Sequence, residues 1–345
     1  MDSMKLEDCC EILDSQRVPI TGSDRTSGDY PYYGANGIQD YVDDFIFDDE
    51  LVLLAEDGGN FGSKTRPIAY RVSGKCWVNN HAHVLKPKAG LDVDYLCYSL
   101  MFYDVGGMVN GATRQKLTQA AMRQMIIPKR SLDEQIEIVN IIKKVQGVIA
   151  SRKEELEQLD LLIKGRFVEL FGDININDKN WKYEPLGELC TIVRGGSPRP
   201  IEQFLGGDVP WIKIGDATDG DSIYLNSTKE HIIQEGIKKS RLVKEGSLIF
   251  ANCGVSLGFA RIITFDGCIH DGWLAMEDID ERLDKVFLLQ ALNQMTEHFR
   301  AIAPAGTQPN LNTAIMKAYK QVIPPIELQR EFINFAKRVT KSKVV

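Results

Sequence analysis

The sequence lacks the motifs that phosphate chemistry and methyl transfer require. It has no phosphate-binding loop of the GxxxxGK[ST] type, and no GxGxxG follows a strand-like run. The Asn/Asp-Pro-Pro-Tyr/Phe loop of DNA amino-methyltransferases is also missing. The only Pro-Pro pair, Pro324-Pro325, precedes a helical pattern, where it is suited to set up the helix start. A standalone methyltransferase or nuclease is therefore not favoured, and no catalytic residue is predicted.

Cysteine pairs and long apolar runs are absent too. The seven cysteines include no CxxC pair, which predicts buried reduced thiols and neither a zinc site nor a disulfide framework. No run approaches the ~18 apolar residues of a membrane-spanning helix. The N-terminal segment 1–13 is acidic and unlike a signal peptide. These features predict a cytoplasmic protein with no membrane partner.

An excess of positive charge is missing as well. The chain carries 41 basic and 48 acidic residues, a net charge of −7, whereas nucleic-acid binders are usually basic. The acidic residues are spread along the chain and do not form a tail. DNA binding would therefore require basic residues to be sorted onto one face by the fold.

A proline-free stretch at 131–171 has apolar residues at alternating steps of four and three. This spacing, near 3.5 residues, predicts a coiled-coil-type helix that lies along another helix, although Arg152 and Arg166 interrupt it. At 1.5 Å per residue the helix would be roughly 60 Å long. A buried core helix is the alternative, which the length disfavours because globular helices average about 11–12 residues. The predicted seam comprises Ile138, Ile142, Val145, Ile149, Leu156, Leu159, Ile163 and Leu170, continued near the C-terminus by Phe332, Ala336 and Val339.

The chain also contains an internal repeat. KLEDCCEIL near the start resembles PLGELCTIV after the long helix, and later positions match at a constant offset of 194, among them Leu117 with Leu311 and Gln135 with Gln329. Chance is an unsatisfactory explanation for an offset kept over this length. The predicted order is a first module (1–130), a long helix (131–171), a second module (172–325) and a shorter helix (326–345).

Each module contains short runs rich in β-branched and aromatic residues, separated by glycine, asparagine and aspartate. Helical patterns occur at 95–103, 118–125 and 285–299. The predicted fold class is α+β, with two similar domains built on twisted β-sheets, joined by the long helix and followed by the shorter one.

Basic and amide side chains gather in or beside the glycine-rich loops, where they could contact phosphates or base edges. The candidate DNA-binding residues are Lys64, Arg66, Asn79, Asn80, Arg114, Lys116, Arg194, Arg199, Lys213, Gln308 and Asn310. Two similar modules joined by a rigid helix could read two half-sites, which lie about 34 Å apart per turn of DNA.

Other residues have less specific interpretations. His81 and His83 alternate on one face of a strand-like run, but no third ligand is evident, so hydrogen-bonded histidines are favoured over a metal site and no metal is predicted. Core packing is favoured over base stacking for four aromatic residues, Tyr32, Tyr33, Trp211 and Trp273.

The chain resembles the specificity subunit of Type I restriction-modification systems over nearly its whole length. The resemblance rests on the order of two modules, each followed by a helical region, and on local patterns. These patterns are YYGANGIQDYV (32–42), SLDEQIEIV (131–139), PLGELCTIVRGGSPRP (185–200), VPWIKIGD (209–216), AGTQPNLN (305–312) and VIPPIELQREFI (322–333). Each motif is degenerate, but together, duplicated and at this spacing, they are specific.

The resemblance implies a non-catalytic subunit that binds double-stranded DNA. Each module would be a target-recognition domain that reads one half of a split, asymmetric sequence. The helices would set the gap between the halves and dock two modification subunits, which would bring S-adenosylmethionine and perform the methyl transfer; the chain itself needs no cofactor. Restriction subunits would join to form the cutting enzyme.

The chain departs from this family in its second helical region, which spans only 326–345, about half the length of the first. If the two helices pack antiparallel, the short one would cover roughly residues 155–171. The uncovered half of the seam would then seek a helix from a modification subunit or from a second copy of the chain. The alternative function is a truncated assembly protein of the same origin that reads no DNA.

Overall fold

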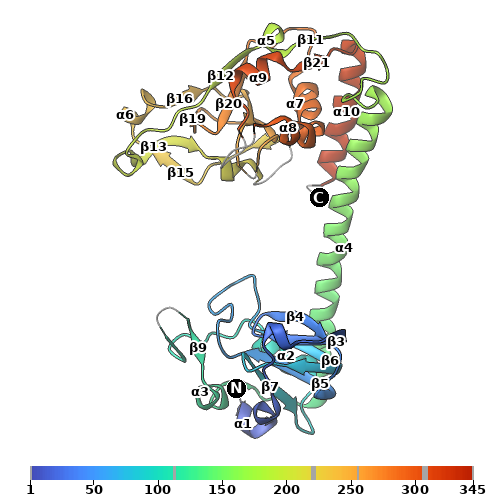
Figure 1. Cartoon of the computed structure of the whole chain (residues 1–345), viewed down its shortest axis with the longest axis vertical. Coiled ribbons are helices and arrows are strands. Elements are labelled where there is room, and N and C mark those ends of the chain that lie inside the picture. Colours follow the sequence, from blue (N-terminus) through green and yellow to red (C-terminus); the bar gives the residue numbers. More distant parts are fainter. Residues whose placement is uncertain (1, 112–113, 219–222, 255, 305–309, 344–345) are drawn as a thin grey trace. The chain divides into compact units, whose positions relative to one another are not determined.

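The computed structural model describes residues 2–111, 114–218, 223–254, 256–304 and 310–343. The chain folds into two compact units, Met1–Arg152 and Lys153–Val345. The boundary falls within the long helix α4 (Leu132–Phe171), so that each unit includes one end of this helix (Figure 1).

The first unit is built on a six-stranded sheet with the strand order β2-β7-β5-β6-β3-β4. Two further strand pairs, β1–β10 and β8–β9, accompany it. The sheet strands are β2 (Cys10–Ile12), β3 (Ser27–Gly34), β4 (Gly37–Val42), β5 (Phe47–Ala55), β6 (Ala69–Val78) and β7 (Ala82–Pro87). The remaining elements are β1 (Ser3–Lys5), α1 (Leu6–Cys9), η1 (Asp14–Gln16), η2 (Gly22–Asp24), α2 (Val93–Leu100), β8 (Val109–Asn110), β9 (Lys116–Leu117), α3 (Gln119–Arg123) and β10 (Ile126–Pro128).

The second unit divides its strands between two sheets, with the orders β12-β20-β17-β18-β14 and β15-β13-β19-β16. The sheet strands are β12 (Thr191–Arg194), β13 (Leu205–Ile212), β14 (Tyr224–Leu225), β15 (Glu230–Ile232), β16 (Arg241–Val243), β17 (Leu248–Ala251), β18 (Ala260–Ile263), β19 (Gly267–Ile269) and β20 (Trp273–Glu277). The remaining elements are β11 (Tyr183–Pro185), α5 (Leu186–Leu189), η3 (Ile201–Gln203), η4 (Ile214–Thr218), α6 (Gln234–Ile237), α7 (Lys285–Gln294), α8 (Thr296–Ile302), α9 (Thr313–Ala318), β21 (Lys320–Val322) and α10 (Ile326–Ser342).

The strand register shows that the two units repeat one architecture. In the first unit β5 pairs with β7, opposing Ala55 to Ala82, and in the second β17 pairs with β20, opposing Ala251 to Trp273. In each unit the first strand pairs antiparallel with the last, β1 with β10 and β11 with β21. The predicted α+β fold with two similar sheet-containing domains is therefore confirmed.

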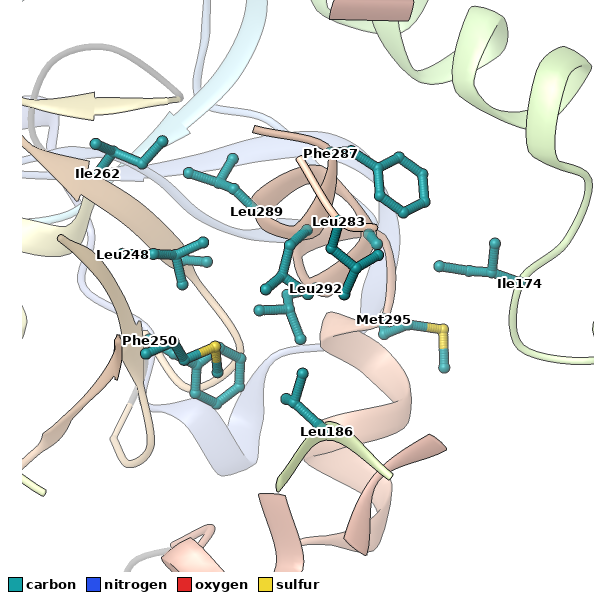
Figure 2. Close-up of a cluster of buried hydrophobic side chains, with 14 of the residues drawn as sticks. Ile174, Leu186, Leu248, Phe250, Ile262, Leu283, Phe287, Leu289, Leu292 and Met295 are labelled. Atoms are coloured by element: carbon teal, nitrogen blue, oxygen red, sulfur yellow. The ribbon is translucent and has the colours of Figure 1, made fainter. Parts of the chain in front are cut away.

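Strand β17 is apolar throughout because its sheet is buried on both faces. In β17, Leu248 and Phe250 face one core, whereas Ile249 and Ala251 face another. Figure 2 shows Leu248 and Phe250 together with Leu289 of α7 in the larger of these cores. Burial on two faces explains why this run lacks the alternation of a half-exposed strand.

A buried glutamine fastens each module to the helix that follows it. The Gln135 amide, in the first turn of α4, accepts a hydrogen bond from Asp92 N (2.8 Å) and donates to the carbonyl oxygens of Gly90 and Arg130. Gln329, in the first turn of α10, accepts from Asp284 N (2.8 Å) and donates to two carbonyl oxygens, those of Arg282 and Pro324. Asp92 and Asp284 are the N-cap residues of α2 and α7, so each glutamine bonds the start of the equivalent helix. This joint between module and helix therefore recurs, and its two glutamines are separated by the predicted offset of 194 residues.

Helix α10 packs antiparallel against the C-terminal part of α4, as expected from the sequence (Figure 1). Phe332 near the start of α10 contacts the rings of Phe167 and Phe171, with centroids 5.3 and 5.7 Å apart. Further along, Lys343 forms an ion pair with Asp160. Phe167 and Phe171 are absent from the predicted seam because the alternating steps of four and three reach the preceding residues, Arg166 and Leu170.

The predicted seam is buried at its C-terminal end. Ile163, Phe332, Ala336 and Val339 are at most 8% exposed, and Leu159 and Leu170 pack against the same core. Leu156 is half-buried.

Towards the N-terminus the seam divides. Ile138 packs against the first module and Ile142 is half-buried, but Val145 and Ile149 are 53% and 50% exposed. Together with Ile141 and Val148, they form an exposed apolar stripe, defined here as Ile141, Val145, Val148 and Ile149. Their spacing places them on one face of α4.

The remaining expectations concern thiols and membranes. All seven cysteines are free; six are buried and Cys253 is half-buried. Burial raises the pKa of the Cys97 thiol to about 11, consistent with an unreactive core residue. Among the described residues, every helix is either too short or too polar to cross a bilayer.

Candidate nucleic-acid interface

The candidate site of the first module lies where the end of β5 meets the loop leading into α3. The backbone of Leu117 donates to the carbonyl oxygen of Glu56 (2.7 Å), and the backbone of Gly58 donates to that of Gln115 (3.0 Å). Gly58 has a positive φ of 69°, which suits glycine. The loop carrying Arg114 and Lys116 is thereby attached to the sheet.

The second module repeats this attachment. The backbone of Leu311 donates to the carbonyl oxygen of Asn252 (2.8 Å), and Cys253 forms an antiparallel bridge with Asn310. The corresponding bridge in the first module joins Asp57 to Lys116. Asn310 is therefore the structural counterpart of Lys116, and these two DNA-binding candidates occupy equivalent loops.

Arg114 and Lys116 lie together and are partly exposed. Arg114 Nε is 2.7 Å from the Asp57 carboxylate, and Lys116 Nζ is 3.0 Å from the Glu56 carboxylate. Their side chains remain 59% and 51% exposed. Because both cationic side chains are more than half exposed, a phosphate could reach either of them.

Of the four other DNA-binding candidates in the first module, three are exposed and one is buried. Lys64, Arg66 and Asn80 are exposed. Asn79 is only 3% exposed; its side chain donates to Gln39 (3.0 Å) and accepts from the backbone of His81 (2.8 Å). The structure thus gives Asn79 a role in holding a turn, which corrects its assignment to DNA contact.

In the second module, three basic candidates are engaged by groups of the same unit. Arg194 Nε donates to the carbonyl oxygen of Asp271 (3.0 Å), and Arg199, whose side chain is 79% exposed, lies 3.9 Å from the Asp271 carboxylate. Lys213 pairs with Glu230 at 2.5 Å. Asp271 brings Arg194 and Arg199 together at one loop. Gln308 lies outside the described residues.

Most of the aromatic candidates belong to the core. Tyr32, Trp211 and Trp273 are at most 4% exposed, as expected for packing and not for base stacking. Tyr33 is half-buried and its ring contacts that of Tyr70 at 5.7 Å.

A buried cluster of charged and titratable side chains lies beside the loop that carries Arg114 and Lys116, and it was not predicted from the sequence. We define the His83 cluster as His83, Asp14 and Glu56 with their partners Arg17 and Lys116. His83 is fully buried, and its Nδ1 lies 2.7 Å from the Asp14 carboxylate. Arg17 bonds Glu56 at 2.6 Å. Because these residues come from distant segments, sequence spacing provides no signal for the cluster.

The carboxyl groups of Asp14 and Glu56 stay ionised because hydrogen bonds and nearby cations offset the cost of burying their charge. Burial disfavours the Asp14 carboxylate, but hydrogen bonds from His83 and the Val84 amide outweigh it and hold the pKa of Asp14 below its ordinary value. Burial likewise opposes ionisation of Glu56, and hydrogen bonds from Arg17 and Lys116 lower the pKa of Glu56.

The side chains of Asp14, Glu56 and His83 are close enough to hold a metal ion, since their ligand atoms lie within 4.8 Å of one another. Arg17 and Lys116 already bond the Glu56 carboxylate, however, and both nitrogens of His83 have hydrogen-bonding partners. The donor set therefore fits a closed hydrogen-bonded network better than a metal site.

Comparison with known proteins identifies the family. The Type I restriction modification DNA specificity domain matches residues 1–161 and again 178–344. A putative type I restriction enzyme specificity subunit from Haemophilus influenzae is 30% identical over 342 residues, covering 95% of this chain and 85% of the relative. The MjaIX specificity subunit of Methanocaldococcus jannaschii is 25% identical, covering 77% of this chain and 67% of the relative.

Solved structures share the fold. A Type I restriction-modification S subunit from M. genitalium superposes with a TM-score of 0.57 at 15% identity, covering 99% of this chain and 90% of that one. A chain from a study of assembly and conformational transition in the type I system gives a TM-score of 0.60 with the same identity and coverage. The duplicated match and the full-length similarity together show that this chain belongs to the family of Type I restriction-modification DNA specificity subunits.

Proposed function

We propose that each module reads one half of a split, asymmetric DNA sequence, and that the duplicated loop at the end of β5 and β17 supplies the contacts. The observation that carries this proposal is the equivalence of the two loops. Lys116 and Asn310 occupy the same bridge position, but one is a cation and the other an amide. Two similar frames with different side chains are suited to recognising two different half-sites.

The helices would dock the partner subunits. The apolar stripe on α4 is exposed, and each of its four residues is at least 50% accessible. A stripe of this kind is typical of a surface that another protein covers. We propose that two modification subunits, or a second copy of this chain, cover it, and that restriction subunits join the assembly.

Catalysis would reside in the partners. The modification subunits would bind S-adenosylmethionine and transfer its methyl group, while this chain would select the DNA in the cytoplasm. The alternative, an assembly protein that reads no DNA, is less well supported because the family match extends over both modules and the C-terminal helix.

The proposal is tested by co-expressing the full chain with its cognate modification subunit and mapping methylated bases in the host DNA. We expect a stable complex and methylation within a motif of two defined halves separated by an unspecified gap. A complex that methylates no sequence-defined site would support the assembly protein instead. Failure to form a complex would contradict the proposed docking role.

Lys64 and Arg66 offer a second prediction. Both are exposed beside the candidate loop, and neither forms an ion pair within the described part of the chain. Replacing both with alanine is expected to weaken DNA binding uniformly across sequences and to reduce the slope of log K against log salt by about 2, since each lost phosphate contact contributes about 0.9. Titrations of labelled duplex at several salt concentrations measure this slope.

The matched control is Lys244→Ala with Lys285→Ala, two lysines of the second module whose partners lie away from its candidate loop. This control should leave the slope unchanged. An equal loss in both double variants would indicate only a general effect of net charge and would contradict phosphate contacts at Lys64 and Arg66.

A further inference from the structure

We propose that His83 is a doubly protonated clamp that positions the DNA-reading loop of the first module, so that recognition of one half-site depends on its charge while recognition of the other does not. This inference rests on the proposed function, in which both modules read DNA. It adds a positioning residue and a pH dependence of the first module.

The first argument is the hydrogen-bonding pattern of the ring. Nδ1 lies 2.7 Å from the Asp14 carboxylate and Nε2 lies 2.9 Å from the carbonyl oxygen of Leu117. A carbonyl oxygen cannot donate, and a neutral imidazole has only one N–H. A neutral ring would therefore satisfy both contacts only if Asp14 carried the proton.

The surroundings of Asp14 favour its ionised form. One carboxylate oxygen accepts from the backbone of Val84 (2.9 Å), and the other, which faces His83, also accepts from the Gln119 amide (2.9 Å). Arg17 lies 3.6 Å from the same oxygen. Since these neighbours present donors to the carboxylate, the proton belongs on His83.

The second argument is the contact between the His83 ring and the DNA-reading loop. Leu117 is fixed at its carbonyl by His83 and at its amide by the backbone of Glu56. Lys116 directly precedes it and Arg114 is two residues further back. A shift of Leu117 would therefore move both cationic side chains of the loop.

The third argument is the balance of charge. Five charged groups face one another in the His83 cluster: the carboxylates of Asp14 and Glu56, and the cations Arg17, Lys116 and His83. Protonated His83 and Arg17 balance the two carboxylates by themselves. Lys116 can then exchange Glu56 for a DNA phosphate without leaving a buried charge uncompensated.

In the described part of the second module, other residue types take the places of His83 and Glu56. In the first unit His83 opposes Leu54 across the sheet, and in the second Leu274 opposes Phe250 at the same register. Asn252 occupies the place of Glu56, since its carbonyl accepts from the loop in the same manner. An apolar residue and an amide at these positions do not titrate, so the second half-site should be insensitive to pH in this respect.

The protonation state is tested on the unaltered protein. With only five histidines in the chain, ¹⁵N-histidine labelling gives a simple spectrum, which His83→Leu assigns. We expect both ring nitrogens of His83 to carry protons at neutral pH. One unprotonated ring nitrogen at neutral pH would overturn the proposal.

The effect on recognition is tested by selecting randomised duplex DNA with the full chain in complex with its modification subunits. Unaltered protein should select two defined halves. His83→Leu, which installs the residue found at this place in the second module, should lower the selectivity for one half roughly tenfold and retain the other. Raising the pH of the unaltered complex until NMR shows His83 to be deprotonated should weaken selection of the same half.

Val84→Ala is the matched control, because Val84 is buried on the opposite face of the same strand and bonds Asp14 only through its backbone. It should leave the selection of both halves intact, together with the pH dependence of the half that the first module reads. If His83→Leu and Val84→Ala affect the same half equally, His83 is a core residue and the clamp is wrong. If unaltered protein selects no defined half at all, the proposed function itself fails, which is a different outcome.

Discussion

Replacing Phe332 with alanine is expected to lower the free energy of unfolding of the second unit by about 3–5 kcal/mol, the cost typical of removing a buried phenylalanine. Phe332 is fully buried and its ring meets those of Phe167 and Phe171 edge-on. Phe287 of α7 completes the group, stacked 5.8 Å from Phe167. The substitution would leave a cavity where two helices and the module meet.

Urea unfolding followed by tryptophan fluorescence measures this loss. Trp181 is a suitable probe because its indole donates to the carbonyl oxygen of Phe171 (2.8 Å), at the end of α4. Val168→Ala is the matched control, since Val168 adjoins Phe167 but is 51% exposed; it should cost about 0.5 kcal/mol or less. Equal losses in the two variants would show that α10 is not held by its aromatic contacts.

The second large effect is expected at Gln329. Its amide accepts one hydrogen bond and donates two, a combination that no carboxylate can provide. Gln329→Met should destabilise the second unit by about 2–4 kcal/mol, because buried backbone groups lose their partners. Gln329→Glu should cost more at neutral pH, since a carboxylate would face two carbonyl oxygens.

The pH dependence of Gln329→Glu separates these causes. Below the pKa of the new side chain, a protonated carboxyl group can again donate one hydrogen bond, so that part of the stability should return. Glu331→Gln serves as control: it removes the exposed ion pair with Arg166 and should cost at most about 1 kcal/mol. A Gln329→Glu variant as stable as the parent at neutral pH would contradict the role of the joint.

The repeat made most of the fold predictable. A constant offset aligned Gln135 with Gln329 and Leu117 with Leu311, and the structure places both pairs at equivalent positions. The bounds of α4 followed from the absence of proline and from the period of its apolar residues. Local and periodic information is sufficient for such features because it resides in neighbouring residues.

The details of the sites were less predictable because they depend on contacts between distant segments. The pairing of Lys116 with Glu56, or of Arg199 with Asp271, has no signature in sequence spacing. Asn79 had the composition of a loop contact but is buried in a turn. The helix seam is buried where α10 covers it, and Val145 and Ile149 are uncovered as expected. Periodicity shows which face of a helix is apolar but not which element covers it.

The pairing of each module's first strand with its last has a consequence for the evolution of such chains. Adjacent strands lie about 4.8 Å apart, so the chain enters and leaves a module at nearly one point. Insertions or exchanges between these strands leave the exit unchanged, provided that they keep the backbone around Asp92 or Asp284 to which the glutamine is bonded. Each module is thus a cassette that can be grafted as a unit, and new half-sites can be acquired without redesign of the helical frame.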